Sequence, residues 1–116
     1  MNILYVENHD VFVSVVRREF LKDHHLIVVP TVAKAIFEFD KSGFDLVLTD
    51  YDLDDGKGSE VIEYIRRTDD VIPIIAVSSH SRGNEAMIEV GANAICSKMK
   101  FENLNKVISG LINGGA

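Results

Sequence analysis

Five short apolar runs recur along this chain, and longer segments with helical spacing lie between them. The runs are Ile3–Val6, Leu26–Val29, Leu46–Leu48, Ile74–Val77 and Ala94–Cys96. Polar residues do not alternate with apolar ones inside these runs, which is typical of strands that are covered on both faces, as in a parallel sheet. The pattern therefore predicts five strands in one parallel sheet.

The clearest helix signals lie in two segments: the one that follows the first apolar run and the one that follows the fifth. Phe12, Val16 and Phe20 recur every four residues in the first segment. In the last segment, apolar residues follow the i, i+3, i+4, i+7, i+8 spacing of an amphipathic helix. These residues are Leu104, Val107, Ile108, Leu111 and Ile112. We therefore expect one helix after the first apolar run and another after the last.

Three more helices are expected, over residues 32–41, about 59–68 and about 84–90. Thr31 is a good N-cap for the first of these, because its hydroxyl can accept a hydrogen bond from the first turn. Gly91 suits a left-handed backbone conformation at the end of the last. Together with the two clearer helices, these segments complete five βα units.

Alternating strands and helices in 116 residues predict a three-layer α/β sandwich with one core. We expect residues 1–116 to form this single domain. The tail Asn113–Ala116 is either a frayed terminus or the start of a linker to a further part of a longer protein.

Composition excludes several classes of function. The net charge is −6 and no basic run could track a phosphate backbone, which argues against direct nucleic-acid binding. No segment approaches the roughly 20 apolar residues that span a bilayer, so no membrane segment is expected. Cys96 is the only cysteine, which excludes an intramolecular disulfide and fits a reducing compartment. We expect a cytoplasmic protein.

Reactive side chains gather where four of the five predicted strands end. They are Glu7–Asp10 after the first run, Asp50–Asp55 after the third, Ser78–His80 after the fourth, and Ser97–Lys98 after the fifth. In open parallel sheets the carboxyl ends of the strands lie at one edge, which is where ligands bind. The sequence therefore predicts one site that contains acids, hydroxyls and a lysine.

The chemistry of these residue types is coherent. Crowded carboxylates repel one another, and a hard divalent cation such as Mg²⁺ relieves the repulsion through oxygen ligands. An aspartate can attack a phosphoryl group, and a lysine ammonium can stabilise the charge on the phosphoryl oxygens. Phosphoryl transfer needs mainly positioning and charge stabilisation. The predicted site is therefore suited to a phosphorylated aspartate.

Four segments together resemble the receiver domains of response regulators in two-component signalling, over essentially the whole chain. They are Ile3–Asn8 for the acidic pair, Asp45–Asp50 for the phosphorylation strand, Pro73–Ser79 for the strand with the switch hydroxyl, and Gly91–Lys98 for the strand with the lysine. Their order and spacing make the resemblance specific, rather than any one segment.

The resemblance implies a flavodoxin-like receiver fold, with a five-stranded parallel sheet in the order 2-1-3-4-5 and five helices. It implies that Asp50 accepts the phosphoryl group, that Ser78 is the switch hydroxyl, and that Lys98 pairs with Asp50 and the phosphate. The expected Mg²⁺ ligands are Glu7, Asn8, Asp50 and the backbone carbonyl of Asp52.

The resemblance also implies partners. A histidine kinase or a phosphotransfer protein would supply the phosphoryl group, and an output domain or a separate protein would read the change. The family's output face is built from the fourth helix, the fifth strand and the fifth helix, and it is compatible with a homodimer. The domain would be a signalling module and not an enzyme.

Four residues depart from the family pattern. Asn8 replaces the acid that usually ligates the metal, which should weaken Mg²⁺ binding, and Asp54 replaces a usual proline and could supply a compensating acid. Met99 replaces the proline that usually follows the lysine, so a cis bond is not expected there. Ile95 replaces an aromatic residue that often moves inward on activation, so the usual hydroxyl–aromatic coupling cannot operate in its common form.

Two other functions fit parts of the pattern. A pseudo-receiver would keep the fold and bind a partner without phosphorylation, which Asn8, Met99 and Ile95 favour. A phosphatase of the haloacid-dehalogenase type would use the D-x-D motif at Asp50–Asp52. In that family, however, the motif follows the first strand, and the chain is longer.

Simpler interpretations exist for individual residues. Glu7 and Asn8 could cap the first helix, and residues 54–56 could form a plain turn. His9 and His80 could tune the phosphate lifetime, although an exposed loop histidine is the commoner case. Cys96 is expected to be a small core residue.

Overall fold

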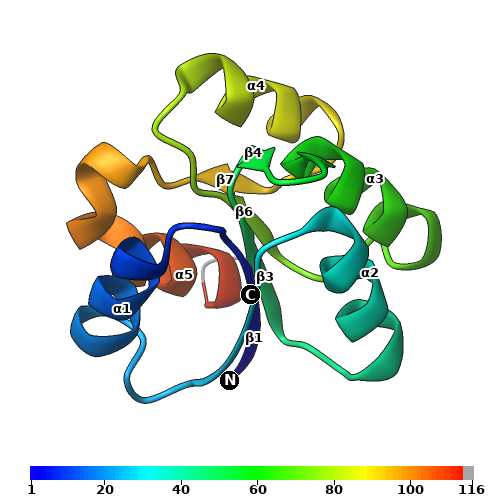
Figure 1. Cartoon of the computed structure of the whole chain (residues 1–116). Coiled ribbons are helices and arrows are strands. Elements are labelled where there is room, and N and C mark those ends of the chain that lie inside the picture. The colour runs from blue at the N-terminus through cyan, green and yellow to red at the C-terminus, as the bar shows by residue number, and fades with distance from the viewer. Residues whose placement is uncertain (114–116) are drawn as a thin grey trace.

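Five parallel strands form the central sheet, in the spatial order β2-β1-β3-β6-β7 (Figure 1). They are β1 (Asn2–Val6), β2 (His25–Val29), β3 (Leu46–Thr49), β6 (Ile74–Ala76) and β7 (Ala94–Ile95). Within the sheet this is the order 2-1-3-4-5, so the predicted fold class is confirmed. The computed structural model describes residues 1–113, and the tail residues Gly114–Ala116 lie outside the described residues.

Helices cover both faces of the sheet and complete three layers (Figure 1). On one face lie α2 (Val32–Lys41), α3 (Gly58–Thr68) and α4 (Ser81–Glu89), and on the other lie α1 (Asp10–Glu19) and α5 (Leu104–Ile112). Residues 3–6 and 46–49 of the two central strands are fully inaccessible to solvent. This two-sided burial explains why the strands are continuous apolar runs in the sequence.

Alternate strand residues point to opposite faces, so the sheet separates two cores. In β1, Leu4 and Val6 belong to the core under α2, α3 and α4, whereas Ile3 and Tyr5 belong to the core under α1 and α5. Tyr5 is the largest fully buried side chain of the chain's described part. Its position near the end of β1 brings a phenol hydroxyl close to the predicted site.

Two predicted helix ends are confirmed. Thr31 Oγ1 accepts a hydrogen bond at 3.1 Å from a backbone N–H three residues on, and so caps α2. Gly91 follows α4 with a φ of +122°, a conformation that side chains disfavour. The fourth helix begins earlier than predicted, at Ser81, because the Asn84 backbone N–H already donates to the His80 carbonyl at 3.0 Å.

The interpretation of Glu7 and Asn8 as helix caps is wrong. The residue that precedes α1 is His9, and its side chain makes no capping hydrogen bond. Glu7 and Asn8 instead contact Lys98 and Asp54, which come from other parts of the chain. Both side chains are therefore engaged at the edge of the sheet and not with the helix.

After β3 comes a two-stranded hairpin that no pattern in the sequence predicts. It consists of β4 (Asp52–Leu53) and β5 (Gly56–Lys57), which pair in antiparallel fashion around a turn at Asp54 and Asp55. The predicted turn therefore exists, but it is not a plain one. The Asp55 carboxylate accepts hydrogen bonds from the first two backbone N–H groups of α2, at 2.7 and 3.1 Å, so the hairpin anchors that helix.

A short 3₁₀ helix, η1 (Lys98–Asn103), is the second element without a predictive pattern in the sequence. Ser97 Oγ caps it by accepting a hydrogen bond from the Met99 backbone N–H at 3.2 Å. No cis peptide bond occurs within residues 1–113, so the absence of a cis bond before Met99 is confirmed. Cys96 lies just beyond β7 and is buried, as expected for a core residue.

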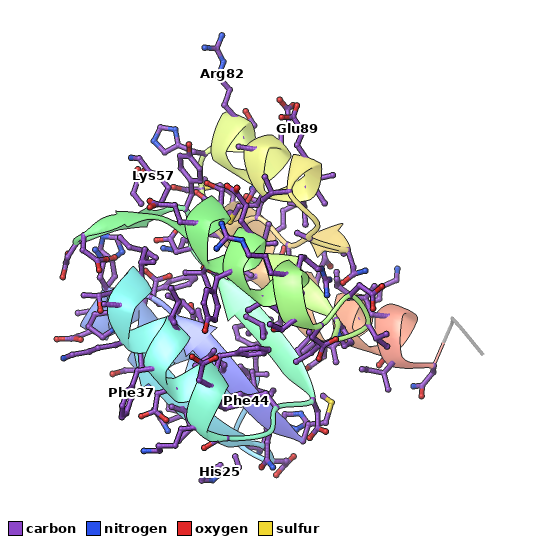
Figure 2. All side chains as sticks on the ribbon, turned by 90° about the vertical axis from the view of Figure 1, so that its right-hand side faces the viewer. His25, Phe37, Phe44, Lys57, Arg82 and Glu89 are labelled. Carbon is purple, nitrogen blue, oxygen red and sulfur yellow. The ribbon has the colours of Figure 1, made fainter. Side chains whose placement is uncertain are left out.

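The outer surfaces of the helices carry charged residues with isolated apolar ones between them. Figure 2 shows Arg82 and Glu89 projecting outward from α4 and Phe37 projecting from α2. Phe37 is exposed, and the Lys41 ammonium lies 5.3 Å from its ring centre. In the described part of the chain, the helices are too short or too polar to cross a membrane.

Gly58, the first residue of α3, leaves no room for a side chain, because a Cβ atom there would overlap the Asp50 backbone oxygen and press on Met87. We expect Gly58→Ala to lower the free energy of unfolding by about 1–3 kcal/mol, since a neighbour must shift. Gly110→Ala in α5 is the control: nothing lies within 4 Å of the added methyl, so it should stabilise by about 0.5–1 kcal/mol. Urea unfolding measures both, and a loss of equal size in the two variants would contradict the packing argument.

Asp55 should make the stability of the fold depend on acid pH. Hydrogen bonds from the backbone N–H groups of Val32 and Ala33 hold the pKa of this carboxyl below its ordinary value. Such a group stabilises the fold above its unfolded pKa, and this contribution is lost as the pH falls through the folded pKa. Asp55→Ala should therefore lower the melting temperature at neutral pH, and the difference from wild type should shrink below about pH 4.

Circular dichroism melts at several pH values test this dependence. Asp70→Ala, which removes an exposed acid at another turn, is the control and should show no difference that shrinks with acid. A melting-temperature difference for Asp55→Ala that stays constant from neutral to strongly acidic pH would contradict the capping role of the carboxylate.

Candidate functional site

Sheet hydrogen bonds continue past the strand ends and fix the backbone of the predicted site. The N–H of Glu7 donates to the last residue of β2 at 2.9 Å, and the N–H of Asp50 donates to the last residue of β1 at 2.9 Å. The N–H of Lys98 donates to the Ser78 carbonyl at 3.3 Å. All four residues therefore lie at the carboxyl edge of the sheet, as the sequence predicts.

Lys98 bridges the two buried acids. Its Nζ atom lies 2.7 Å from Glu7 Oε1 and 2.9 Å from Asp50 Oδ2. The exposed fractions of the side chains are 13% for Lys98, 5% for Asp50 and 0% for Glu7, so the ion pairs are shielded from water. The Lys98 ammonium also lies 4.8 Å from the ring centre of Phe12, in the geometry of a cation–π contact.

The carboxylate of Asp50 is held at both oxygens. Oδ1 accepts a hydrogen bond from the Tyr51 backbone N–H at 2.8 Å, and Oδ2 accepts one from Lys98 Nζ. The Asp50 backbone oxygen accepts from Thr49 Oγ1 at 2.9 Å and is crowded by Gly58. The acid therefore has one fixed orientation at the end of β3.

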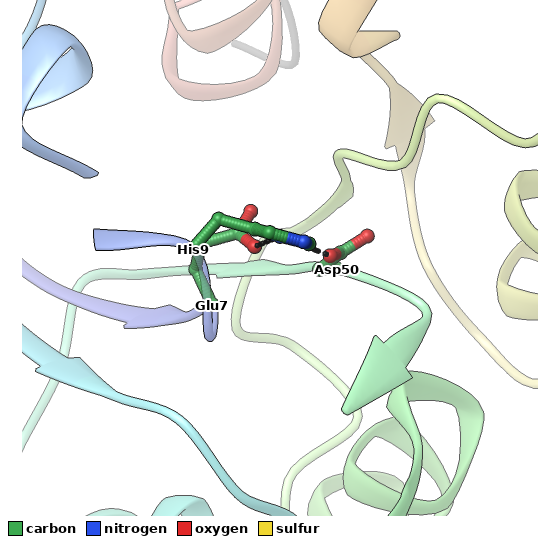
Figure 3. Close-up of side chains that lie close together, drawn as sticks. All are labelled: Glu7, His9 and Asp50. Carbon is green, nitrogen blue, oxygen red and sulfur yellow. Dashed lines mark hydrogen bonds and ion pairs between the residues drawn. The ribbon is translucent and has the colours of Figure 1, made fainter. Parts of the chain in front are cut away.

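The Glu7 carboxylate contacts four polar groups. Besides Lys98, the Tyr5 hydroxyl donates to it at 3.3 Å, the Asn8 backbone N–H donates at 3.2 Å, and His9 Nδ1 lies 2.9 Å away (Figure 3). Burial raises the pKa of Glu7, and the hydrogen bonds from Lys98 and His9 offset part of that rise. Burial and the neighbouring Glu7 charge also raise the pKa of the Tyr5 hydroxyl.

His9, which the sequence places beside the predicted site, is a member of this cluster. Its Nδ1 atom lies 3.9 Å from Asp50 Oδ2, and one ligand atom from each of Glu7, His9 and Asp50 lies within 4.8 Å of the others (Figure 3). The imidazole itself is 64% exposed, as expected for a loop histidine. Its only signal in the sequence is its place two residues after Glu7.

Asn8 presents the two ends of its amide differently. The nitrogen Nδ2 donates to Asp54 Oδ1 at 2.9 Å. The oxygen Oδ1 is buried and accepts no hydrogen bond from residues 1–113. A buried acceptor without a partner is costly and calls for an explanation, such as an ion.

The residues at this edge fit a magnesium ion. Glu7 and Asp50 offer carboxylate oxygens, and Asn8 offers the unpartnered amide oxygen. Mg²⁺ prefers oxygen ligands and commonly takes one or two carboxylates. The side chain of Asp52 points elsewhere and pairs with Lys57, which lowers the pKa of Asp52, so only its backbone carbonyl is a candidate.

Ser78 is buried at the end of β6, but no hydrogen bond within residues 1–113 joins its hydroxyl to Asp50. Its Oγ accepts instead from the His80 backbone N–H at 3.1 Å. Asn84, which is buried in α4, accepts from the Ser78 N–H at 3.0 Å and donates to the Ser78 carbonyl at 2.9 Å. Asn84 thus fixes the Ser78 backbone, a role that its position in a helix does not reveal.

Comparison with protein families gives one match, the response regulator receiver domain, over residues 3–109. No curated protein matches the chain. The match covers the five strands apart from Asn2 and both unpredicted elements, so it includes every residue of the site described above.

Solved structures with the same fold share little sequence. The receiver domain of the sensor histidine kinase PA1611 from Pseudomonas aeruginosa, with a magnesium ion in its active site cleft, has a TM-score of 0.87 at 22% identity, covering 99% of this chain and 98% of that one. The response regulator TrrA from Thermotoga maritima, in complex with Mg²⁺–BeF, has a TM-score of 0.86 at 20% identity, covering 96% and 98%.

A putative response regulator from Chloroflexus aurantiacus has a TM-score of 0.86 at 16% identity, covering 95% of each chain. Identities this low show the fold alone, and the family is shown by the match over residues 3–109. The chain belongs to the family of response regulator receiver domains.

Proposed function

We propose that this domain accepts a phosphoryl group on Asp50 in a Mg²⁺-dependent reaction and then changes a partner-binding surface. The observation that carries the proposal is the placement of Asp50. Its buried carboxylate ends β3, with one oxygen held by the Tyr51 N–H and the other by Lys98 Nζ. An acid that is oriented in this way beside a lysine is suited to receive a phosphoryl group.

The donor would be a phosphohistidine on a histidine kinase or a phosphotransfer protein. A carboxylate oxygen of Asp50 attacks the phosphorus atom, and the P–N bond to the donor's imidazole breaks. The electron pair of that bond stays on the nitrogen, and the product is an aspartyl phosphate. Lys98, which already contacts Asp50 at 2.9 Å, stabilises the charge on the phosphoryl oxygens.

Glu7, Asn8, Asp50 and the backbone carbonyl of Asp52 are the groups that would hold Mg²⁺. When bound, the cation neutralises negative charge on the phosphoryl oxygens. The unpartnered oxygen of Asn8 supports this assignment. The magnesium ions in the Pseudomonas and Thermotoga proteins also support it, since those domains have the same fold.

The response to phosphorylation would pass through Ser78. Its hydroxyl would turn from the His80 N–H to the phosphoryl group, and its carbonyl is joined to the Lys98 backbone N–H. Ile95 of β7 is 41% exposed and stands where relatives carry a moving aromatic residue. The change would therefore reach the face formed by α4, β7 and α5 through the backbone near Lys98. An output domain, a separate protein or a second copy of the domain would read that face in the cytoplasm.

A phosphorylation-independent interaction module is the second candidate. Lys98 favours it, because its ammonium lies 2.7 Å from Glu7 and 2.9 Å from Asp50 and so compensates their negative charges without a metal ion. Asn8 favours it as well, because it carries one negative charge fewer than the acid usual at that position.

Incubation with Mg²⁺ and acetyl phosphate should add the mass of one phosphoryl group to the wild-type protein, as measured by intact-mass spectrometry. The gain should be absent in Asp50→Asn, because the amide is not a nucleophile for phosphorus. Asp55→Asn is the matched control. This change removes the charge of a nearby acid and keeps one of the two oxygens that cap α2. The variant should form the adduct as wild type does.

Two other results would change the assignment. If wild type forms no adduct and does not respond to beryllofluoride, the phosphoacceptor role is wrong and the interaction module is favoured. Sustained turnover of phosphate esters would instead support a phosphatase.

Asn8→Asp should tighten Mg²⁺ binding by about tenfold, because ligand charge sets the affinity of such sites. It should also lower the melting temperature in the absence of Mg²⁺, because a third carboxylate would join Glu7 and Asp50 and face Asp54. Isothermal titration calorimetry and thermal melts with and without Mg²⁺ measure the two effects. Unchanged Mg²⁺ affinity would contradict a ligand role for Asn8.

A further inference from the structure

The amide of Asn8 can serve a cation in only one of its two orientations. Its oxygen is an acceptor and can ligate a metal, whereas its nitrogen carries two hydrogens and would repel one. The two ends have nearly the same shape, so packing alone does not choose between them. Some polar neighbour must therefore fix which end is buried.

Asp54 is that neighbour. Its Oδ1 atom accepts a hydrogen bond from Asn8 Nδ2 at 2.9 Å, and a carboxylate can only accept. The nitrogen end of the amide is thus tied to the hairpin turn. The oxygen end is left buried, without a hydrogen-bond donor among residues 1–113.

The turn that carries Asp54 is itself anchored. Asp55, the next residue, binds the first two N–H groups of α2 at 2.7 and 3.1 Å. At the base of the hairpin, Lys57 pairs with Asp52, and its backbone N–H donates to Glu60 at 2.7 Å. The hairpin therefore holds Asp54 in place on the side of Asn8, although the Asp54 side chain is exposed.

We propose that Asp54 is a positioning residue for the cation site: by accepting the N–H of Asn8, it fixes the amide oxygen as a metal ligand. The inference rests on the Mg²⁺ site of the proposed function. Asn8 carries no negative charge, unlike an acid at that position. Asp54, which is hydrogen-bonded to Asn8, supplies one. A hydrogen bond from the amide nitrogen to an anion polarises the amide and makes its oxygen a better ligand.

Mg²⁺ titrations by calorimetry test the proposal, with Asp54→Ala and Asp54→Asn in the wild-type and Asn8→Asp backgrounds. In the wild-type background, Asp54→Ala should weaken Mg²⁺ binding by about tenfold, as loss of an outer partner of a metal ligand commonly does. Asp54→Asn keeps an acceptor oxygen and should retain most of the affinity. With Asn8→Asp there is no amide to orient, so both changes should cost less than about twofold.

Asp10→Asn is the charge control, because it removes one negative charge two residues from Asn8 without touching its amide. It should leave the affinity within about twofold of wild type. Equal losses in Asp54→Ala, Asp54→Asn and Asp10→Asn, persisting with Asn8→Asp, would show a general charge effect and overturn the positioning role.

A readout without metal separates this inference from the proposed function. The side-chain NH₂ signals of Asn8 in ¹H–¹⁵N NMR should shift in Asp54→Ala without Mg²⁺, because their acceptor is lost. Mg²⁺ binding that is unaffected by Asp54→Ala overturns the positioning role alone. If neither wild type nor Asn8→Asp binds Mg²⁺, the metal site of the proposed function fails, and the positioning role fails with it.

Discussion

The pair of ion contacts made by Lys98 is the interaction on which the rest of the site depends. Glu7 and Asp50 end neighbouring strands, and both carboxylates are almost fully buried. Two buried acids so close would repel each other, and burial of an uncompensated charge costs several kcal/mol. One ammonium that reaches both acids resolves this, but only if the chain after β7 returns to the same edge. The fifth strand, the Ser97 cap and η1 together meet that requirement.

Two sets of hydrogen bonds hold these three charged side chains in place. Hydrogen bonds between neighbouring strand ends fix the backbone of Glu7, Asp50 and Lys98. Two uncharged groups support this frame: the Tyr5 hydroxyl donates to the Glu7 side chain, and the Asn84 amide fixes the Ser78 backbone. Each of these groups is buried and polar, and each has its partner, which gives the site the rigidity that charge stabilisation needs.

Sequence reasoning predicts the features that have a repeating physical signal. The five strands appear because two-sided burial requires apolar runs, and the helix at residues 104–112 appears because its buried stripe has helical spacing. The hairpin at residues 52–57 has strands of two residues, too short for any period. Asn84 is a single polar residue whose role comes from its contact with the Ser78 backbone, so no pattern marks it. The position of His9 beside the site is predicted, but its contact with Glu7 is not. The capping role considered for Asn8 is wrong because α1 begins one residue later than such a cap requires: His9 is the residue that precedes the helix, and the Asn8 amide oxygen accepts no hydrogen bond from residues 1–113.

The close approach of Gly58 to the Asp50 backbone has a mechanical consequence. Even a methyl group at the start of α3 would overlap the Asp50 carbonyl, so this helix approaches the strand that carries Asp50 more closely than a residue with a side chain would permit. The contact is with the main chain of Asp50 and not with its carboxylate. The position of the acid therefore depends on a residue outside the charged cluster, and a larger side chain at residue 58 would alter the site by moving its backbone.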